Sequence, residues 1–318
     1  MARVVVVVYA GAEALDLTGP ASVFAAALRR GRNAYQIVYA SVGGGPRPLN
    51  SGLVIQTVDL RRLRLRRTDT VLVPGGEEPP LVGALSDQAL IGWLKHAKAR
   101  VRRVTSVCSG AFLLAEAGLL DGKRCATHWR ACARLAQDYP RTTVDANAIY
   151  VNSGRVWTSA GVTTGIDMAL ALVEADLGRA EVDRISRELV LYVRRPGSLS
   201  QFSAALVAQT TSSSALRGAL EWARDHMAEA TVDGLARRAG VSVRTLHRLC
   251  RQEQRTTPGK LLDRMRVERC QLLLSTTDDP LKLVAAASGF DTSTRMKRAF
   301  KRDLGFAPRQ YRDFRGAP

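Results

Sequence analysis

Two clusters of basic and hydroxyl side chains in the last third of the chain have the residue types needed to read DNA. Arginine can donate two parallel hydrogen bonds to guanine, while serine and threonine can bind bases or phosphates. The first cluster is Arg244, His247 and Arg248, and the second is Ser293, Thr294, Arg295, Lys297 and Arg298. Four further cations, Lys260, Lys301, Arg302 and Arg312, are predicted to contact phosphate. Together these residues predict an interface with double-stranded DNA.

A cysteine in the first half of the chain offers a second kind of chemistry. Cys108 stands between an apolar, strand-like run at 104–107 and a helical pattern at 111–117. An elbow of this kind exposes the side chain at the top of a sheet, and the helix N-terminus favours a thiolate. Because free cysteine is also among the most often buried residues, simple packing is the competing interpretation.

The DNA-reading clusters need short helices joined by tight turns. The pattern of the first copy is an apolar helix, a turn at Gly240 and a second helix capped by Ser242, and the second copy repeats it with a turn at Gly289. The inward positions are Leu235, Ala236, Ala239, Leu246 and Leu249 in the first copy, and Val284, Ala285, Met296 and Phe300 in the second. A basic helix face is often only solvated. Two copies joined by a helical pattern at 258–274 nevertheless favour a duplicated helix-turn-helix.

The cysteine needs a sheet beneath it, and the residues before 194 predict one. Alternating strand-like and helical patterns indicate an α/β domain with a doubly wound, mostly parallel sheet, because apolar runs such as 4–9 are typical of strands buried on both faces. Strands are predicted at 4–9, 35–42, 70–73, 104–107, 143–145, 149–152 and 156–158, and helices at 20–29, 87–99, 111–117, 165–177 and 179–193.

Ligands of such sheets bind beyond the carboxyl ends of the strands, so the residues that follow each strand define the predicted cleft. It consists of Asp16, Glu13, Gly75, Gly76, Cys108, Ser109, His128, Ser159 and Gly161. The glycines expose backbone amides, and the hydroxyls can hold a carboxylate or an amide. The competing interpretations are a structural histidine beside Trp129, a simple loop charge at Glu13, and ordinary turn residues elsewhere.

The sequence predicts two domains joined by a linker at 194–214. The first, at 1–193, is an α/β ligand-sensing and dimerisation domain. The second, at 215–318, is an all-α DNA-binding domain with two helix-turn-helix motifs. The linker combines Pro, Gly and Ser/Thr residues around an apolar patch at 202–207, which is expected to dock on one of the domains.

The charge balance fits a polyanionic partner. The 318 residues have an ordinary apolar fraction of 46% but a net charge of +18. Residues 214–318 hold 21 Lys and Arg against 12 Asp and Glu, which is half of the excess on a third of the chain. The arginine-rich run at 61–67 is interpreted as a solvated segment before a core strand, because no base-reading element accompanies it.

Several classes of protein are excluded by the same survey. The sequence has no apolar run of 18 residues and no signal-cleavage pattern, so we expect no membrane span and a cytoplasmic, nucleoid-associated protein. The five cysteines follow neither a zinc spacing nor a disulfide framework. We therefore predict no metal and no cofactor.

Two family resemblances follow from these motifs. The last 100 residues or so resemble the AraC/XylS-type DNA-binding domain, on Gly289-Phe290, the run 299–302 and the exit at 305–308, although Arg295 and Met296 stand where that family often has aromatic residues. Residues 3–190 resemble the PfpI-like branch of the class I glutamine amidotransferase-like superfamily, and LDLTGP at 15–20 is similar to the run of isocyanide hydratases.

The second resemblance implies that Asp16 accompanies the elbow cysteine. Hydrolytic relatives commonly carry histidine directly after that cysteine as a base, and here the position is Ser109. Isocyanide hydratases keep the cysteine and the acid without this histidine, so its absence does not by itself exclude an enzyme.

The two domains in this order resemble the GlxA-type transcriptional regulators. The resemblance implies a bacterial, sequence-specific DNA-binding regulator that is not an enzyme, forms a homodimer through its first domain, and senses a small nitrogen-containing or amino-acid-like metabolite. One alternative is a DNA-tethered hydrolase or isocyanide-hydratase-like lyase with Cys108 as nucleophile and Asp16 as its partner. Another is a dimerisation platform whose cleft binds nothing.

Overall fold

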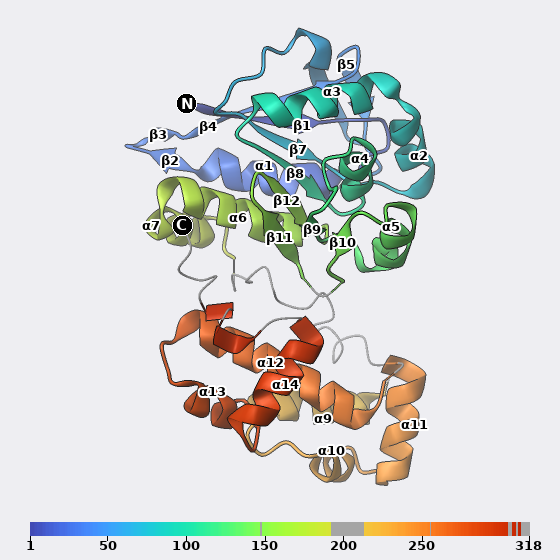
Figure 1. Cartoon of the computed structure of the whole chain (residues 1–318), viewed down its shortest axis with the longest axis vertical. Helices are drawn as coiled ribbons and strands as arrows, with labels where there is room; N and C mark the ends of the chain where they lie inside the picture. The colour runs from blue at the N-terminus through green and yellow to red at the C-terminus, as the bar shows by residue number, and fades with distance from the viewer. Residues whose placement is uncertain (147, 192–212, 255, 305–306, 310, 313–318) are drawn as a thin grey trace. The chain divides into compact units, whose positions relative to one another are not determined.

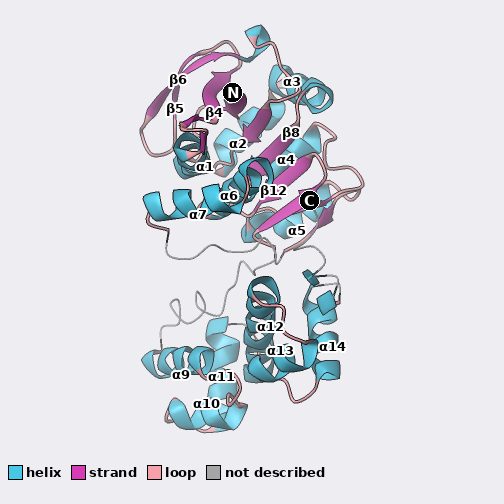
Figure 2. Cartoon of the chain, turned by 90° about the vertical axis from the view of Figure 1, so that its left-hand side faces the viewer, coloured by secondary structure: helices cyan, strands magenta, loops and turns pink. Residues whose placement is uncertain are grey.

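The computed structural model describes residues 1–146, 148–191, 213–254, 256–304, 307–309 and 311–312. The chain divides into two compact units, Met1–Gly197 and Ser198–Pro318 (Figure 1). The described part of the first unit combines a sheet with helices, and that of the second consists of helices and the loops between them (Figure 2). The predicted apolar patch at 202–207 lies outside the described residues.

An eight-stranded sheet forms the centre of the first unit. Its strands are β1 (Ala2–Val7), β4 (Tyr35–Ser41), β5 (Gly45–Pro48), β6 (Val54–Asp59), β7 (Thr70–Val73), β8 (Arg103–Val107), β11 (Tyr150–Ser153) and β12 (Val156–Ser159). They lie in the order β11-β12-β8-β7-β1-β4-β6-β5. All neighbours are parallel except the outer pairs β11–β12 and β5–β6. The prediction of a mostly parallel, doubly wound sheet is confirmed.

The valine run explains why β1 is central. Val4, Val5, Val6 and Val7 are each 0% exposed, so side chains on both faces of this strand are buried. β-branched residues favour the extended backbone, and only a central strand covered on both faces can bury all of them. The amino ends of β1, β4, β7, β8 and β12 consequently meet at one edge of the sheet, and their carboxyl ends meet at the other.

Two groups of helices cover this sheet. The first group is α1 (Ala14–Ala26), α6 (Thr164–Leu177) and α7 (Arg179–Glu188), which pack on one another, and the second is α2 (Glu78–Ser86), α3 (Gln88–Arg100) and α4 (Gly110–Glu116). A shorter helix, α5 (Cys132–Asp138), lies beside the two-stranded pair β9 (Arg124–Cys125) and β10 (Thr143–Val144).

The start of α1 corrects the sequence prediction, which began this helix at residue 20. The helix begins at Ala14, because the Glu13 carboxylate accepts a hydrogen bond from the Leu15 amide and caps the first turn. Pro20 lies inside the helix rather than at its start. Its ring is accommodated where α6 presents Gly165, at which an added Cβ would lie 3.1 Å from the ring. Asp16 is therefore part of a helix and not of a loop.

The end of α7 is the second correction, since the helix was predicted to reach residue 193. Val190 adopts a left-handed conformation with φ of 53°, and the Leu191 amide donates a hydrogen bond to the Ser186 carbonyl. This is the arrangement that closes a helix C-terminus, and the helix accordingly ends at Glu188.

The elements that were not predicted include β2, β3, β5, β6 and β9 and the helices α2 and α5. The hairpin of β2 (Leu28–Arg29) and β3 (Arg32–Asn33) is short and charged, and β5 contains two prolines, which are tolerated because it is an edge strand. The strand β6 alternates half-buried and exposed residues and lacks a strong apolar signal. The helix α2 carries prolines at 79 and 80, which occupy its first turn, where no amide partner is lost.

The second unit contains two small cores joined by one long helix. Its helices are α9 (Ser214–Asp225), α10 (Val232–Arg238), α11 (Val243–Gln254), α12 (Pro258–Thr276), α13 (Leu281–Ala287) and α14 (Ser293–Leu304). The first half of α12 contributes Leu261, Leu262 and Met265 to the core formed with α9, α10 and α11. Its second half contributes Val267, Cys270 and Leu274 to the core formed with α13 and α14. Each fully buried large side chain contributes about 1.5–3 kcal/mol to stability, so α12 is essential to both halves.

Among the helices of the described ranges, none is both long enough and apolar enough to cross a membrane.

Candidate functional site: a DNA interface and a cysteine elbow

The first helix-turn-helix consists of α10 and α11. Gly240 has φ of 64°, a conformation that glycine adopts without strain, and it turns the chain between the helices. The Ser242 hydroxyl accepts a hydrogen bond from the Thr245 amide at 3.1 Å and caps α11 as predicted. Leu246 and Cys250 are 0% exposed, whereas Leu249 is only half-buried. This inner face fixes which side of α11 is left for DNA.

The outer face of α11 carries the predicted reading residues. Arg244 and Arg248 are exposed and His247 is half-buried. Within the described part of the chain, none of the three side chains is engaged in a hydrogen bond or ion pair. They are available to base edges or phosphates.

The second helix-turn-helix consists of α13 and α14 and has the same construction. Gly289 has φ of 76°, and an added Cβ would overlap the carbonyl oxygen of Met227, so glycine is required there on two counts. The Thr292 hydroxyl accepts a hydrogen bond from the Arg295 amide at 3.1 Å and caps α14. Met296 and Phe300 are 0% exposed, as predicted for the inner face.

The outer face of α14 carries two kinds of cation. Lys297, Arg298 and Lys301 are exposed, and among the described residues they have no ion-pair partner. Arg295 and Arg302 are instead paired with acids: Arg295 lies 2.7 Å from the Asp291 carboxylate and Arg302 lies 2.6 Å from that of Asp303. Both also approach the Asp263 carboxylate on α12 at 3.6 Å. These two arginines would have to exchange their carboxylate partners for DNA.

Of the remaining predicted residues of this interface, three lie at helix starts and the fourth, Arg312, is hydrogen-bonded within the unit. Ser293 is half-buried and Thr294 is exposed at the start of α14, and Lys260 is exposed near the start of α12. Arg312 donates a hydrogen bond to the Asp279 carbonyl at 2.5 Å, which ties the end of the chain to the beginning of α13.

Cys108 occupies the elbow predicted for it, between β8 and α4. Its φ of 56° is in the left-handed region, where a non-glycine residue is strained. Two bonds hold the strained peptide: the Cys108 amide donates to the Ser159 carbonyl at 3.0 Å, and the Thr127 hydroxyl donates to the Cys108 carbonyl at 2.9 Å. The half-buried thiol is thus set in a fixed position at the carboxyl edge of the sheet.

Two predicted glycines press directly on this elbow. A Cβ added to Gly161, whose φ is 117°, would lie 2.6 Å from the Cys108 Cβ. A Cβ added to Gly75 would lie 2.8 Å from the same atom and 2.7 Å from the Ser109 amide nitrogen. Any side chain at these positions would displace the elbow, so glycine is required by close backbone approach.

Asp16 holds both glycine turns in place. Its Oδ2 accepts a hydrogen bond from the Gly75 amide at 2.9 Å, and its Oδ1 accepts one from the Val162 amide at 2.8 Å. The carboxyl group is fully buried, and this burial raises its pKa to about 7 although both hydrogen bonds lower it. Asp16 therefore changes its charge near neutral pH.

The thiol itself is a weak nucleophile. Burial and, next, the nearby Asp16 carboxylate raise the pKa of Cys108 to about 12, although hydrogen bonds from Ser109 lower it. Tyr9, two residues after β1, is also buried, and its pKa is raised by burial and by the charges of Asp16 and Cys108. Because the thiolate is the reactive form, this raised pKa disfavours Cys108 as a nucleophile.

The other predicted cleft residues are placed less uniformly. The Ser109 hydroxyl donates to the Gly76 carbonyl at 2.9 Å and accepts from the Gly76 amide at 3.0 Å, so it closes the turn instead of facing a ligand. Glu13 caps α1 and accepts a hydrogen bond from the Asn50 side chain at 2.5 Å. The Ser159 hydroxyl is buried beneath the elbow and has no hydrogen-bond partner in the described structure.

His128 is not brought to the thiol by any interaction of the described structure. Its ring packs against Trp129, with 5.5 Å between centroids, and burial together with Arg130 lowers its pKa. The neighbour Thr127 makes the contact with Cys108 instead. Sequence reasoning missed Thr127, Tyr9 and Val162. Tyr9 is the last residue of a predicted strand and Val162 closely follows another, which is the signal that could have identified them.

Comparisons with known proteins agree with this arrangement. Residues 2–175 match the family model of the DJ-1/PfpI family, and residues 235–313 match that of a helix-turn-helix domain. The HTH-type transcriptional regulator GlxA of Rhizobium meliloti is 31% identical, over 89% of this chain and 87% of its own. The HTH-type transcriptional regulator CdhR of Pseudomonas aeruginosa is 29% identical, over 86% of this chain and 80% of its own.

A solved structure of a THiJ/PfpI family protein from Pseudomonas syringae has the same fold. It superposes with a TM-score of 0.56 at 24% identity and covers 75% of this chain and 90% of its own.

Proposed function

The chain belongs to the DJ-1/PfpI family, among the members that carry a helix-turn-helix domain and regulate transcription, and from this premise we propose how it reads DNA and what its first unit does. The protein is a DNA-binding transcriptional regulator. The single observation that carries the proposal is the duplication: two buried inner faces orient two basic outer faces on one unit.

We propose that α11 and α14 are the recognition helices. Arg244, His247 and Arg248 read one major-groove segment, and Ser293, Thr294, Arg295, Lys297 and Arg298 read the next, about 34 Å along the duplex. Lys260, Lys301, Arg302 and Arg312 are assigned to phosphate. Exposure of the unpaired cations, and the caps that start both helices, support this assignment.

The test uses the full chain and a binding site selected from random duplexes. Arg244→Ala and Arg298→Ala should each weaken binding to the selected site by about 1–3 kcal/mol and leave binding to unrelated DNA almost unchanged. Arg224→Ala is the matched control, because this arginine is exposed on α9, outside both motifs, beside Asp225. An equal loss on selected and unrelated DNA would show that the two arginines contact only the backbone.

We further propose that the carboxyl edge of the sheet, around Cys108, binds a small polar metabolite without converting it. The support is a strained residue held by three other segments, since such strain persists where function requires it. At neutral pH the thiol is protonated and Asp16 is only partly charged, which favours a neutral or zwitterionic compound, such as a nitrogen-containing or amino-acid-like metabolite.

A thiol reagent tests whether the site leaves its ligand unconverted, because conversion would require a reactive Cys108. The other four cysteines are buried, so iodoacetamide reports on Cys108. With a pKa of about 12, the thiolate fraction at pH 8 is on the order of 10⁻⁴, and alkylation should be far slower than for an ordinary thiol. Rapid alkylation at pH 7 would support the cysteine-enzyme alternative instead.

We also propose that the first unit forms a homodimer through the exposed face of β6. Leu53, Val54 and Val58 are 55%, 56% and 47% exposed, and Val54 and Val58 point to the same face of the strand. Val54→Asp with Val58→Asp should produce a monomer in sedimentation experiments, whereas Val82→Asp, at an exposed position of α2, should not. A dimer that survives the double substitution would exclude this face.

A further inference from the structure

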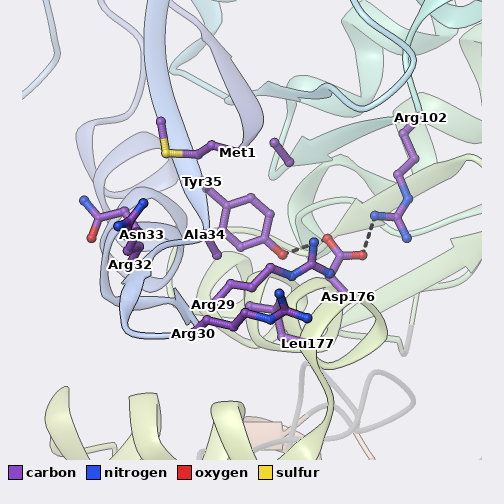
Figure 3. A pocket seen from close by; sticks show the side chains of 11 residues that line it. Met1, Arg29, Arg30, Arg32, Asn33, Ala34, Tyr35, Arg102, Asp176 and Leu177 are labelled. Atoms are coloured by element: carbon purple, nitrogen blue, oxygen red, sulfur yellow. Dashed lines mark hydrogen bonds and ion pairs between the residues drawn. The ribbon is translucent and has the colours of Figure 1, made fainter.

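The amino edge of the sheet, opposite the cysteine elbow, contains a pocket. It has a volume of about 920 Å³ and is lined by Arg29, Arg30, Arg32 and Arg102, together with Tyr35 and Asp176. Figure 3 shows the Tyr35 hydroxyl and the Arg102 guanidinium meeting the Asp176 carboxylate, at 2.7 Å each. Neither the DNA-reading helices nor the cysteine elbow accounts for this surface.

The hairpin of β2 and β3 concentrates positive charge at a cost. Arg29 and Arg32 are direct cross-strand partners, and Arg30 and Gly31 form the turn between them with φ of 52° and 74°. Like charges that face each other across two strands destabilise a hairpin. All three arginines are exposed, and the described structure provides no acid or hydrogen-bond acceptor for their guanidinium groups. An anionic partner would remove this repulsion.

The arginine-rich run at 61–67 reaches the same edge. Arg3 at the start of β1 binds both the Arg64 carbonyl, at 2.6 Å, and the Asp69 carboxylate, at 2.5 Å. Asp69 also accepts a hydrogen bond from the Arg66 amide, and its carbonyl accepts one from the Arg102 amide. This network joins the run at 61–67 to the arginines before β8. From the sequence alone, no base-reading element accompanied this run.

The carboxylates of this network are already ion-paired, so the net exposed charge of the edge is positive. Asp69 is fully buried and pairs with Arg3, while Asp176 is 8% exposed and pairs with Arg102 and Arg103. Exposed arginines without an ion-pair partner in the described ranges remain at 29, 30, 32, 62, 64, 66, 67 and 100. Arg155, before β12, donates to the carbonyls of residues 101 and 102 and extends the basic edge by one more strand.

The extent of this edge distinguishes a polymer from a small ligand. It crosses the amino ends of β4, β1, β7, β8 and β12, which at about 4.8 Å between strands is roughly 19 Å. Phosphates of one DNA strand recur about every 3.4 Å along the duplex axis, so such an edge spans several of them. A single phosphate or carboxylate would need only one of these positions.

We propose that the basic edge of the first unit, formed by the β2–β3 hairpin, the run at 61–67 and the residues before β8, binds the phosphate backbone of duplex DNA. The inference rests on the proposed function, because it assumes that the protein binds DNA through its helix-turn-helix motifs. It adds a second, sequence-independent contact from the unit that lacks a helix-turn-helix. This contact strengthens binding through phosphates and carries no base specificity.

The test is the salt dependence of binding by the full chain to a random-sequence duplex, followed by fluorescence anisotropy. Arg30→Glu with Arg32→Glu should weaken binding at least tenfold at low salt. The slope of log affinity against log salt should fall by about 0.9 for each phosphate that is no longer neutralised, or about 2 for both substitutions together. The matched control is Lys95→Glu with Arg130→Glu, which makes the same change in net charge at exposed positions on α3 and beside Trp129.

Each outcome has a definite meaning. Equal losses in the edge and control variants would show a general effect of net charge and overturn the proposal, as would an unchanged slope in the edge variant. Titration of inorganic pyrophosphate provides a further arm: binding that the edge variant abolishes, with DNA binding unaffected, would make the pocket a small-anion site instead.

Failure of the edge proposal is separable from failure of the recognition helices. Arg298→Glu, on α14, should weaken binding to a selected site whatever the edge does. If Arg298→Glu has no effect and the edge variant does, then the assignment of the reading helices is wrong and the edge contact stands. Unchanged circular dichroism and an unchanged melting temperature establish that the edge variant folds, since within the described ranges the Arg30 and Arg32 side chains have no ion-pair partners to lose.

Discussion

Replacement of Asp16 by asparagine tests the electrostatics of the cysteine elbow. The carboxyl group has a pKa near 7 in the folded protein against 3.8 in its ordinary state, because burial disfavours its charge. The folded state thus binds the proton more tightly than the unfolded state between pH 4 and pH 7. Stability should fall as pH rises through this window, and the loss should be complete above pH 7.

The size of the effect follows from the shift. Three pKa units at about 1.36 kcal/mol each correspond to about 4 kcal/mol of unfolding free energy between pH 4 and pH 8, as an upper figure. The asparagine side chain has no charge to bury, so the variant loses this dependence. The asparagine also points its N–H₂ group at one of the two backbone amides that donate to Asp16, those of Gly75 and Val162. The lost hydrogen bond lowers the unfolding free energy by about 1–3 kcal/mol at every pH.

The measurement is the denaturant-induced unfolding of the first unit at pH 5 and pH 8, followed by tryptophan fluorescence. Three of the four tryptophans, Trp93, Trp129 and Trp157, belong to this unit. We expect Asp16→Asn to be less stable than the wild type at pH 5 and to equal or exceed it at pH 8. The difference between the two pH values is independent of the constant cost of the missing acceptor.

Asp59→Asn is the control, because hydrogen bonds from Arg61 hold the pKa of that carboxyl at about 2, below the range of the experiment. Its folded pKa is lowered, so its contribution to stability is present above its ordinary pKa and is lost only as pH falls through about 2. The control should therefore follow the wild-type pH dependence. If Asp16→Asn did so too, burial of this carboxyl would not have the effect assigned to it.

Three further outcomes are expected. Gly161→Ala should destabilise the first unit by more than the backbone strain of about 1–3 kcal/mol, because the new Cβ meets Cys108. Gly154→Ala is the control and should cost only that strain, because Gly154 has a positive φ but open space around it. Equal losses of stability in thermal melts would show that the close approach to Cys108 is not the reason. Asp263→Asn should raise the affinity for random duplex DNA modestly, because it removes one negative charge beside Arg295 and Arg302, which keep their closer partners Asp291 and Asp303; an unchanged affinity in anisotropy titrations would show that the Asp263 carboxylate does not compete with DNA. Cys108→Ser should keep metabolite-dependent regulation in a reporter assay, and loss of the response would indicate covalent chemistry.

The sequence predicted those elements whose signal is local. The valine run, the strand-to-helix elbow at Cys108 and the two glycine turns followed by capped helices all lie where patterning placed them. Each depends on residues close in the chain: β-branched residues for the strand, glycine for the left-handed turn, and a hydroxyl at the helix start.

The parts that escaped prediction depend on distant partners. Pro20 lies within α1 because Gly165, far along the chain, leaves room for its ring. Asp16 was expected beside the cysteine, yet its carboxylate binds the backbone amides of Gly75 and Val162, which no spacing reveals. The basic edge forms only when Asp69 joins the run at 61–67 to Arg3 and Arg102.

The central claim is that two helices of one unit read consecutive stretches of a promoter. Hydroxyl-radical and methylation protection of a site selected by the full chain tests it most directly. We predict two protected major-groove segments about one helical turn apart, of which Arg244→Ala removes one and Arg298→Ala the other. A single protected segment that both substitutions weaken equally, or protection that is the same on every sequence, would contradict the account.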